Sequence, residues 1–316
     1  MTSVKLIVIT WGIVFLFVAC NNDESSSPNC ISTIKLNVNR GACNATLPFS
    51  SEFQQIISGT KRIITTNSIP DHKVGLFGNI PGALNPNTIS EQSGSYTINL
   101  NPSVAISFTP LLSSSGIKVG PQYSFGILLN GIELDPVAAE PFPHQEMMDS
   151  NVNWNWNLEA LNVNLGLDCN NGHVQPNGKY HYHSSPISYL ENLNVSDTEM
   201  TLIGYAADGF PIYYKYAYAN ASDNTSKIIE MVSSYRLKTG KRSGDGISAP
   251  CGTYNGVYTN DYEFVEGLGI LDEANGRVGV TPDHPSGTYY YVITDNFPSI
   301  PRYFRGTPSN DFQIGR

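Results

Sequence analysis

The most chemically suggestive stretch of the chain is GKYHYHSSP at residues 178–186, in which tyrosine and histidine alternate from Tyr180 to His183. The whole chain has six histidines, and two of them lie here. In an extended strand alternate side chains share a face, so His181 and His183 should point one way and the two tyrosines the other. Imidazoles spaced about 6.6 Å apart at Cα can converge on one ion. Imidazole suits zinc, copper, nickel or iron rather than magnesium or calcium.

A third imidazole lies eight residues upstream, at His173. The sequence QPNG at 175–178 between them is a strong turn signal, so a hairpin should return His173 alongside the pair. Three histidines with an open fourth position form a known catalytic zinc arrangement and also a copper arrangement. Asp168 is expected to orient one imidazole. The alternative is a strand with two exposed histidines and no ligand.

Other residues that could do chemistry lie in turn-rich segments. Asp208 stands in ADGFPIYY at 207–214, where a hairpin turn is the simpler interpretation. Glu273 and Arg277 lie in LDEANGRVGV at 271–280; Arg277 could bind an anionic group or pair with a nearby acid. Nucleophile-elbow, HExxH and phosphate-loop motifs are all absent from the sequence. The sequence therefore leaves open whether the protein is an enzyme.

The N-terminus is typical of an export signal. Lys5 precedes the apolar run LIVITWGIVFLFVA at 6–19, which is short for a membrane span. FVAC at 17–20, followed by polar NNDESSSPN, resembles a bacterial lipoprotein signal with Cys20 as the lipidated residue. Residues 1–19 would then be the signal peptide and 20–29 a flexible tether. An ordinary signal peptide or an uncleaved anchor would also export the chain.

Four cysteines remain after Cys20, and an even number in an exported chain favours two disulfides. Three pairings are possible. We expect the local pair Cys30–Cys43 and the long-range pair Cys169–Cys251. No CxxC is present, so a structural zinc site of the usual spacing is not expected.

The composition favours strands joined by many turns. Only 14% of residues are charged, and Gly, Pro, Tyr, Ser, Thr and Asn fill the gap. Strands are expected at 61–66, 95–100, 123–134, 201–206, 210–218 and 287–294, and short helices at 49–59 and 223–237. No βαβ alternation is visible. We therefore predict a mainly β, antiparallel sandwich or distorted barrel with at most a few short helices, in which 30–58 forms a small cap or lead-in and 59–316 the main β domain.

Charge excludes one class of partner. The net charge is −9 and no basic cluster is present, so the chain is a poor candidate for binding nucleic acid.

Several segments together resemble the YHYH-domain family of exported bacterial proteins, which is named for the motif at Tyr180–His183. The resemblance runs through residues 68–92, 126–136, 167–186, 203–214 and 271–295. The family pattern DxCNGH is stretched here by one asparagine, which could move His173 relative to the pair. The resemblance implies an exported β-rich domain with two characteristic cysteines, of which Cys169 is one, but it supplies no activity. It also adds His72, in IPDH, as a possible further ligand; a turn histidine bonded to backbone is the alternative.

Three functions are compatible with these features. The first is an exported, membrane-anchored lipoprotein that faces the periplasm or cell surface and binds zinc or copper through His173, His181 and His183. The second is an extracytoplasmic metal-dependent hydrolase that uses acids such as Asp208 or Glu273 beside an open metal site. The third is a cell-surface adhesion or carbohydrate-binding module built on the tyrosine-rich strands.

Overall fold

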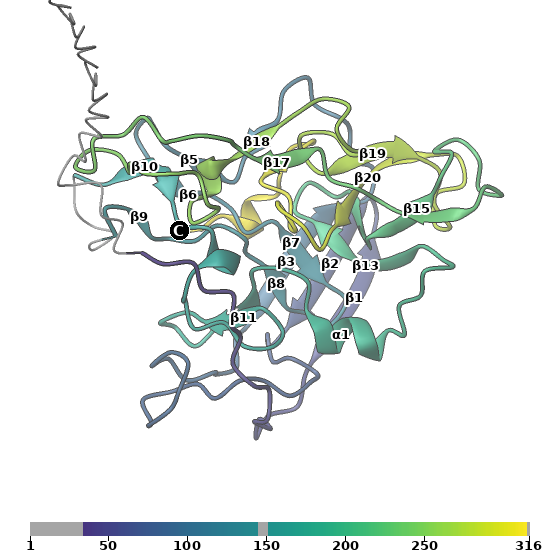
Figure 1. The fold of residues 1–316 in the computed structure, drawn as a ribbon. Helices are drawn as coiled ribbons and strands as arrows, with labels where there is room; N and C mark the ends of the chain where they lie inside the picture. The colour runs from purple at the N-terminus through teal and green to yellow at the C-terminus, as the bar shows by residue number, and fades with distance from the viewer. Residues whose placement is uncertain (1–33, 145–150, 315–316) are drawn as a thin grey trace, which may run out of the picture.

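The computed structural model describes residues 34–144 and 151–314, and Figure 1 shows their arrangement. The expected signal peptide and tether, together with Cys20 and Cys30, lie outside these residues. The described chain is mainly β, as predicted. In these two ranges no helix combines the length and the apolar character that crossing a bilayer requires.

An eight-stranded open sheet is the centre of the molecule. Its strands, in spatial order, are β11 (Gly172–Val174), β12 (Tyr180–Tyr182), β8 (Glu133–Leu134), β7 (Gly126–Leu128), β13 (Thr201–Ala206), β14 (Pro211–Tyr214), β20 (Thr288–Ile293) and β19 (Gly276–Gly279). Neighbours are antiparallel except for two parallel pairs, β12 with β8 and β14 with β20. The sheet is therefore mixed and does not close into a barrel, which corrects the purely antiparallel expectation.

A second, three-stranded antiparallel sheet packs on the same core. It consists of β1 (Phe53–Ser58), β2 (Lys61–Thr66) and β3 (Gly94–Asn99). Ile64 and Ile98 of this sheet join Ile127, Ile203 and Ile212 of the large sheet in one buried cluster. The two sheets therefore share one hydrophobic core. The boundary expected at residue 59 falls in the turn between the paired strands β1 and β2.

The remaining strands form short antiparallel pairs. These are β9 (Pro141–Phe142) with β10 (Asn153–Asn157), β15 (Tyr216–Tyr218) with β16 (Ile228–Glu230), β17 (Tyr235–Leu237) with β18 (Tyr262–Phe264), β4 (Thr109–Pro110) with β21 (Tyr303–Phe304), and β5 (Leu112–Ser113) with β6 (Gly120–Pro121). The described helices are α1 (Ile187–Asn192) and three 3₁₀ turns at Ala160–Asn162, Thr259–Asp261 and Asn310–Phe312. In Figure 1, β5, β10, β17 and β18 occupy the upper side of the view, whereas β11 and α1 lie below.

Both expected helices are strands. Residues 49–59 contain β1, whose backbone pairs along its whole length with β2. Residues 223–237 contain β16 and β17, each paired with a different partner. In both segments the pairing with a neighbouring strand overrides the weak local preference for helix. The expected strands at 61–66 and 201–206 are confirmed as β2 and β13, and 210–218 is divided into β14 and β15.

A histidine cluster on the β11–β12 hairpin: the candidate metal centre

The β11–β12 hairpin places the three histidines, as the sequence predicts. β11 and β12 are antiparallel, and His173 lies directly opposite His181 in the register. The turn closes through hydrogen bonds between Gln175 and Lys179 and from Gly178 to Gln175. Gly178 has φ +86°, a left-handed conformation that glycine adopts without a Cβ penalty. This turn brings His173 onto the same face as the histidine pair.

The three Nε2 atoms converge on one point. His181 Nε2 and His183 Nε2 are 3.2 Å apart, and His183 Nε2 and His173 Nε2 are 3.1 Å apart. Tetrahedral ligands at zinc–nitrogen bonds of about 2.0–2.1 Å lie about 3.3 Å from one another. Two of the three nitrogen–nitrogen separations therefore already match those around one small cation. All three ligand nitrogens lie within 4.8 Å of one another, so these residues could hold a metal ion.

The outer ring nitrogens explain why Nε2 faces inward. His173 Nδ1 is 3.0 Å from the carbonyl oxygen of Leu165, and His181 Nδ1 is 3.4 Å from that of Lys179. A carbonyl only accepts hydrogen bonds, so each Nδ1 carries the hydrogen and each Nε2 presents a lone pair. His183 Nε2 faces the lone pairs of both His173 Nε2 and His181 Nε2. It can carry one hydrogen at most, so it can donate to only one of them. A cation at the common point would satisfy all three nitrogens.

Burial keeps the cluster in the neutral form that binds metals. His181 and His183 are only 2% and 3% exposed. Burial lowers the pKa of His173, and it lowers the pKa of His181 and His183 well below the ordinary value, with the neighbouring imidazoles adding to the effect. Neutral imidazole is the metal-binding form.

Asp168 has a different task from the one expected. Its Oδ1 accepts hydrogen bonds from the backbone of Asn170 and Gly172, and its Oδ2 accepts from Gly75 N and Tyr180 Oη. Because the Nδ1 atoms of His173 and His181 contact backbone carbonyls, Asp168 orients neither of these imidazoles. It fixes the turn that leads into β11 and anchors the tyrosine side of β12.

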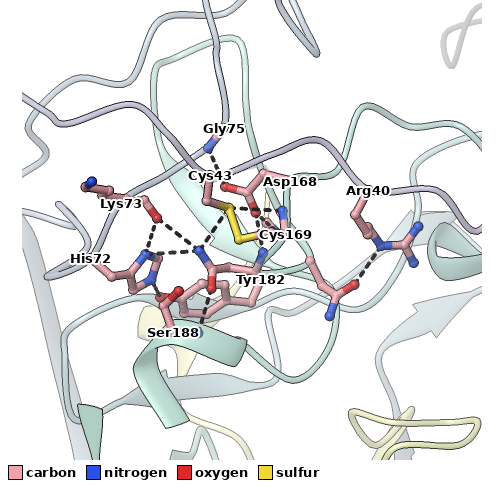
Figure 2. Close-up of a disulfide and its surroundings, with 12 residues drawn as sticks. Arg40, Cys43, His72, Lys73, Gly75, Asp168, Cys169, Tyr182 and Ser188 are labelled. Carbon is pink, nitrogen blue, oxygen red and sulfur yellow. Dashed lines mark hydrogen bonds between the residues drawn. A yellow bond between two sulfur atoms is a disulfide. The ribbon is translucent and has the colours of Figure 1, made fainter. Parts of the chain in front are cut away.

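The tyrosine face of β12 is buried, as predicted, and it is where His72 lies. Tyr180 and Tyr182 are fully buried. The Tyr182 hydroxyl is 2.6 Å from His72 Nε2 and accepts a 3.1 Å hydrogen bond from Asn130 Nδ2. His72 Nδ1 is 2.8 Å from the carbonyl oxygen of Lys73. Figure 2 shows the His72 ring beside Tyr182. His72 thus holds a tyrosine of the motif and is not a member of the histidine cluster.

The disulfide beside this face joins Cys43 to Cys169, with a Cα–Cα distance of 5.6 Å (Figure 2). Both expected pairs, Cys30–Cys43 and Cys169–Cys251, are therefore wrong. Cys251 is disulfide-bonded, but to neither Cys43 nor Cys169. The bridge connects the N-terminal segment to the turn that precedes His173, where Gly41 and Asp168 also form a β-bridge.

The inserted asparagine of the turn is accommodated by side-chain hydrogen bonds. Asn170 is fully buried; its amide lies 3.1 Å from His72 Nδ1, and its Oδ1 accepts from Ser188 N. Asn171, at φ +54°, accepts from Arg40 Nε and donates to Ser185 O. Both asparagines connect the turn to surrounding segments, so the longer turn still delivers His173 to the cluster.

Asp208 is a structural carboxyl of the β13–β14 turn. Its Oδ2 accepts hydrogen bonds from Tyr291 Oη at 2.5 Å and from Gly306 N at 2.8 Å. Burial raises the pKa of Asp208 to about 6, and these hydrogen bonds oppose the shift. Asp208 therefore fastens the C-terminal segment to the sheet, and its hydrogen bonds include none to the cluster.

Glu273 and Arg277 lie at the opposite edge of the large sheet from the histidines. β12 is the second strand in the spatial order and β19, which carries Arg277, is the eighth. At about 4.8 Å per strand this places Arg277 more than about 25 Å from the cluster. Arg277 Nε donates to Tyr290 Oη, and the Glu273 carbonyl accepts from Tyr235 Oη. None of the three expected catalytic residues is brought to the histidines.

A buried ionic group next to the cluster was not predicted. Glu133 is the register partner of His181 on β8, and both its carboxylate oxygens accept from Lys179 Nζ, at 2.9 and 3.0 Å. Asp135, two residues further on, is buried, and burial together with the charge of Glu133 raises its pKa to about 7. The sequence places Lys179 two residues before His181, so the two side chains share a face of the strand. The parallel pairing of β12 with β8, which brings Glu133 beside them, carries no local sequence signal.

Comparison with known proteins identifies the family. The family model described as "YHYH protein" matches residues 95–306, which is more than half of the chain and includes the histidine cluster. The chain therefore belongs to the YHYH family, and the resemblance inferred from its motifs is confirmed. Searches of curated proteins and of solved structures gave no match.

Proposed function

We propose that this YHYH-domain protein binds a single late transition metal ion, zinc or copper, through His173, His181 and His183. The observation that carries the proposal is the convergence of the three imidazoles: His183 Nε2 lies 3.2 and 3.1 Å from the Nε2 atoms of His181 and His173, and all three ligand nitrogens lie within 4.8 Å of one another. Three neutral imidazoles form a ligand set that zinc and copper prefer, whereas magnesium and calcium require oxygen ligands. When bound, the ion would place a compact positive charge at the point where the lone pairs of the three nitrogens meet.

Metal binding has more support than metal-dependent hydrolysis. Hydrolysis requires an acid or base within reach of the ion. Asp208, Glu273 and Arg277 are engaged elsewhere, and the acids beside the cluster, Glu133 and Asp135, are bonded to Lys179 and Gln175. Two of the three histidines are almost fully buried, which limits the approach of a large substrate. The rigid hairpin, the buried tyrosines and the disulfide instead hold the ligands still, which favours tight binding.

A metal titration tests the proposal. Metal-free, untagged full-length protein in detergent should take up one equivalent of Zn²⁺ per chain, with a Kd below about 1 µM in competition with a chromophoric chelator. Cu²⁺ should compete for the same equivalent. Absence of saturable binding of either ion at micromolar concentration would contradict the proposal and leave the motif a structural role.

We further propose that the protein is exported and anchored to a membrane through a lipid on Cys20, facing the periplasm or the cell surface. The apolar run at 6–19 and the FVAC sequence at 17–20 support this proposal. The Cys43–Cys169 disulfide also supports it, because such bonds persist mainly in oxidising compartments. The negative net charge of the chain argues against a nucleic-acid partner.

Lipid attachment gives a direct prediction for Cys20. Cells that produce the protein and are fed an alkyne-tagged fatty acid should yield a tagged wild-type chain, and Cys20→Ala should abolish the tag. Ser188→Ala is a control that keeps Cys20 and the disulfide cysteines and should still be tagged. An untagged wild-type protein with a free N-terminus near residue 20 would show ordinary secretion instead.

A further inference from the structure

A cavity of about 260 Å³ lies on the side of the molecule that carries the short strand pairs. Residues of β4, β5, β10, β17, β18 and β21 line it, and in Figure 1 the labels β5, β10, β17 and β18 gather along the upper side of the view. No histidine of the metal centre is among the lining residues. The cavity is thus a second candidate site with its own lining residues.

Aromatic rings form much of the wall. The aromatic lining residues are Trp154, Tyr235, Tyr262, Phe297 and Tyr303. The rings of Tyr262 and Phe297 stack on one another, with centroids 4.0 Å apart and planes 5° apart. Tyr235 meets Phe297 edge-on at 5.3 Å and 74°. Because Tyr262 and Phe297 already stack directly on each other, a planar base cannot insert between these two rings. Single ring faces remain, and these suit the apolar C–H face of a saturated ring.

Polar groups interrupt the aromatic wall. Ser114, Asn155, Asn157, Thr259 and Asn260 also line the cavity. Hydroxyls and side-chain amides both donate and accept hydrogen bonds, so together they match a ligand whose rim carries several hydroxyl groups. Asn157, Thr259 and Asn260 already make at least one protein hydrogen bond each through their side chains, and an apolar ligand would deprive their remaining polar atoms of water, which costs free energy.

Arg302 contributes an ion-paired guanidinium to the wall. It is 8% exposed and lines the cavity. Its Nη2 donates to both carboxylate oxygens of Glu159, at 3.1 and 2.8 Å, and its Nη1 donates to Pro136 O. Its Nε is buried away from the cavity surface.

The charge of Arg302 is already neutralised, and this decides the class of ligand. Glu159 is buried at the ion pair, so a second carboxylate or phosphate placed near Arg302 would be repelled by Glu159 and would have to lose its own hydration. An uncharged oxygen, such as a sugar hydroxyl, can lie beside the ion pair without either cost.

We propose that this cavity binds one neutral sugar unit, stacked on an aromatic face and hydrogen-bonded through its hydroxyls to the polar rim. The volume of about 260 Å³ lies just below the usual range of ligand pockets, which begins at about 300 Å³. One sugar ring, free or at the end of a glycan, fits this size better than an extended chain. A YHYH protein with this cavity carries a carbohydrate subsite in addition to its metal centre.

Saturation-transfer NMR on the full-length protein in detergent tests the proposal. The probes are glucose, galactose, mannose, N-acetylglucosamine and, as the anionic comparison, glucuronic acid. At least one neutral sugar should bind saturably with a Kd of about 0.1–10 mM, the range expected for so few contacts. Binding of glucuronic acid alone would overturn the proposal, as would no binding of any neutral probe.

Two cavity variants and one control locate the binding. Asn155→Ala removes an exposed amide from the rim, and Tyr303→Leu removes one aromatic face while leaving an apolar side chain. Each substitution should weaken the binding of the sugar at least fivefold. Asn192→Ala, an exposed asparagine at the end of α1, should leave it unchanged. Circular dichroism confirms folding, and Asn155→Ala alone decides the matter if Tyr303→Leu does not fold. Unchanged affinity in the folded cavity variants would place the sugar elsewhere and overturn the proposal.

Discussion

Replacing either His181 or His183 by alanine should remove the bound metal while leaving the β domain folded. Each side chain contributes one Nε2 to the convergent cluster, and two imidazoles cannot complete the set. Loss of an outer hydrogen-bond partner of a metal ligand already costs 10–100-fold in affinity, so loss of a ligand itself should cost more than about 100-fold. Zinc and copper content by plasma mass spectrometry, with circular dichroism on the same samples, measures both parts of the expectation.

His72→Ala is the matched control, because it also deletes one imidazole from the motif region. Its ring bonds Tyr182 on the other side of β12, so the variant should keep its metal even if it loses some stability. Wild-type metal content in both His181→Ala and His183→Ala would contradict the assignment. Equal loss in all three variants would show a general effect of destabilisation.

Removing the Cys43–Cys169 bond should have the largest effect on stability. The two cysteines are 126 residues apart, and on the chain-entropy model closing a loop of this length contributes up to about 5 kcal/mol to the free energy of unfolding. The bond also holds the N-terminal segment against the turn before His173. The double variant Cys43→Ser/Cys169→Ser should therefore unfold at a markedly lower urea concentration than the wild type.

The comparison is best made with a chelator present, so that metal binding contributes nothing to either curve. Ser188→Ala is a useful control near the bridge, since only the backbone N–H of Ser188 bonds to Asn170 and the substitution preserves it. Coincident unfolding curves for the double variant and the wild type would show that the bond does not stabilise the domain.

The metal cluster could be predicted because its signals are local. A period of two over Tyr180–His183 sets which side chains share a face, and a turn of known chemistry sets where His173 returns. Both are properties of a single hairpin, and the structure contains that hairpin in the expected register.

The errors concern contacts between segments far apart in the chain. Four cysteines allow three pairings, and neither spacing nor composition indicated that Cys43 meets Cys169. His72 and Asp168 were recognised as important polar residues, but their partners on the tyrosine face depend on how residues 68–75 pass beside β12. The segment 49–59 has a weak helical pattern, yet it forms β1 because its backbone can pair with the neighbouring strand β2. Asp208 lies in the turn that the sequence indicated. Arg277 lies on β19, a strand that was not expected, and the order of strands in the sheet separates it from the histidines.

X-ray absorption at the zinc edge, on untagged protein loaded with one equivalent of Zn²⁺, tests the central claim most directly. The account predicts three imidazole nitrogens at about 2.0–2.1 Å, with the multiple-scattering pattern of histidine rings and one further light-atom ligand completing four-coordination. A first shell with fewer than three imidazoles, or one dominated by sulfur or by six oxygens at longer distance, would contradict the assignment of His173, His181 and His183 as the metal ligands.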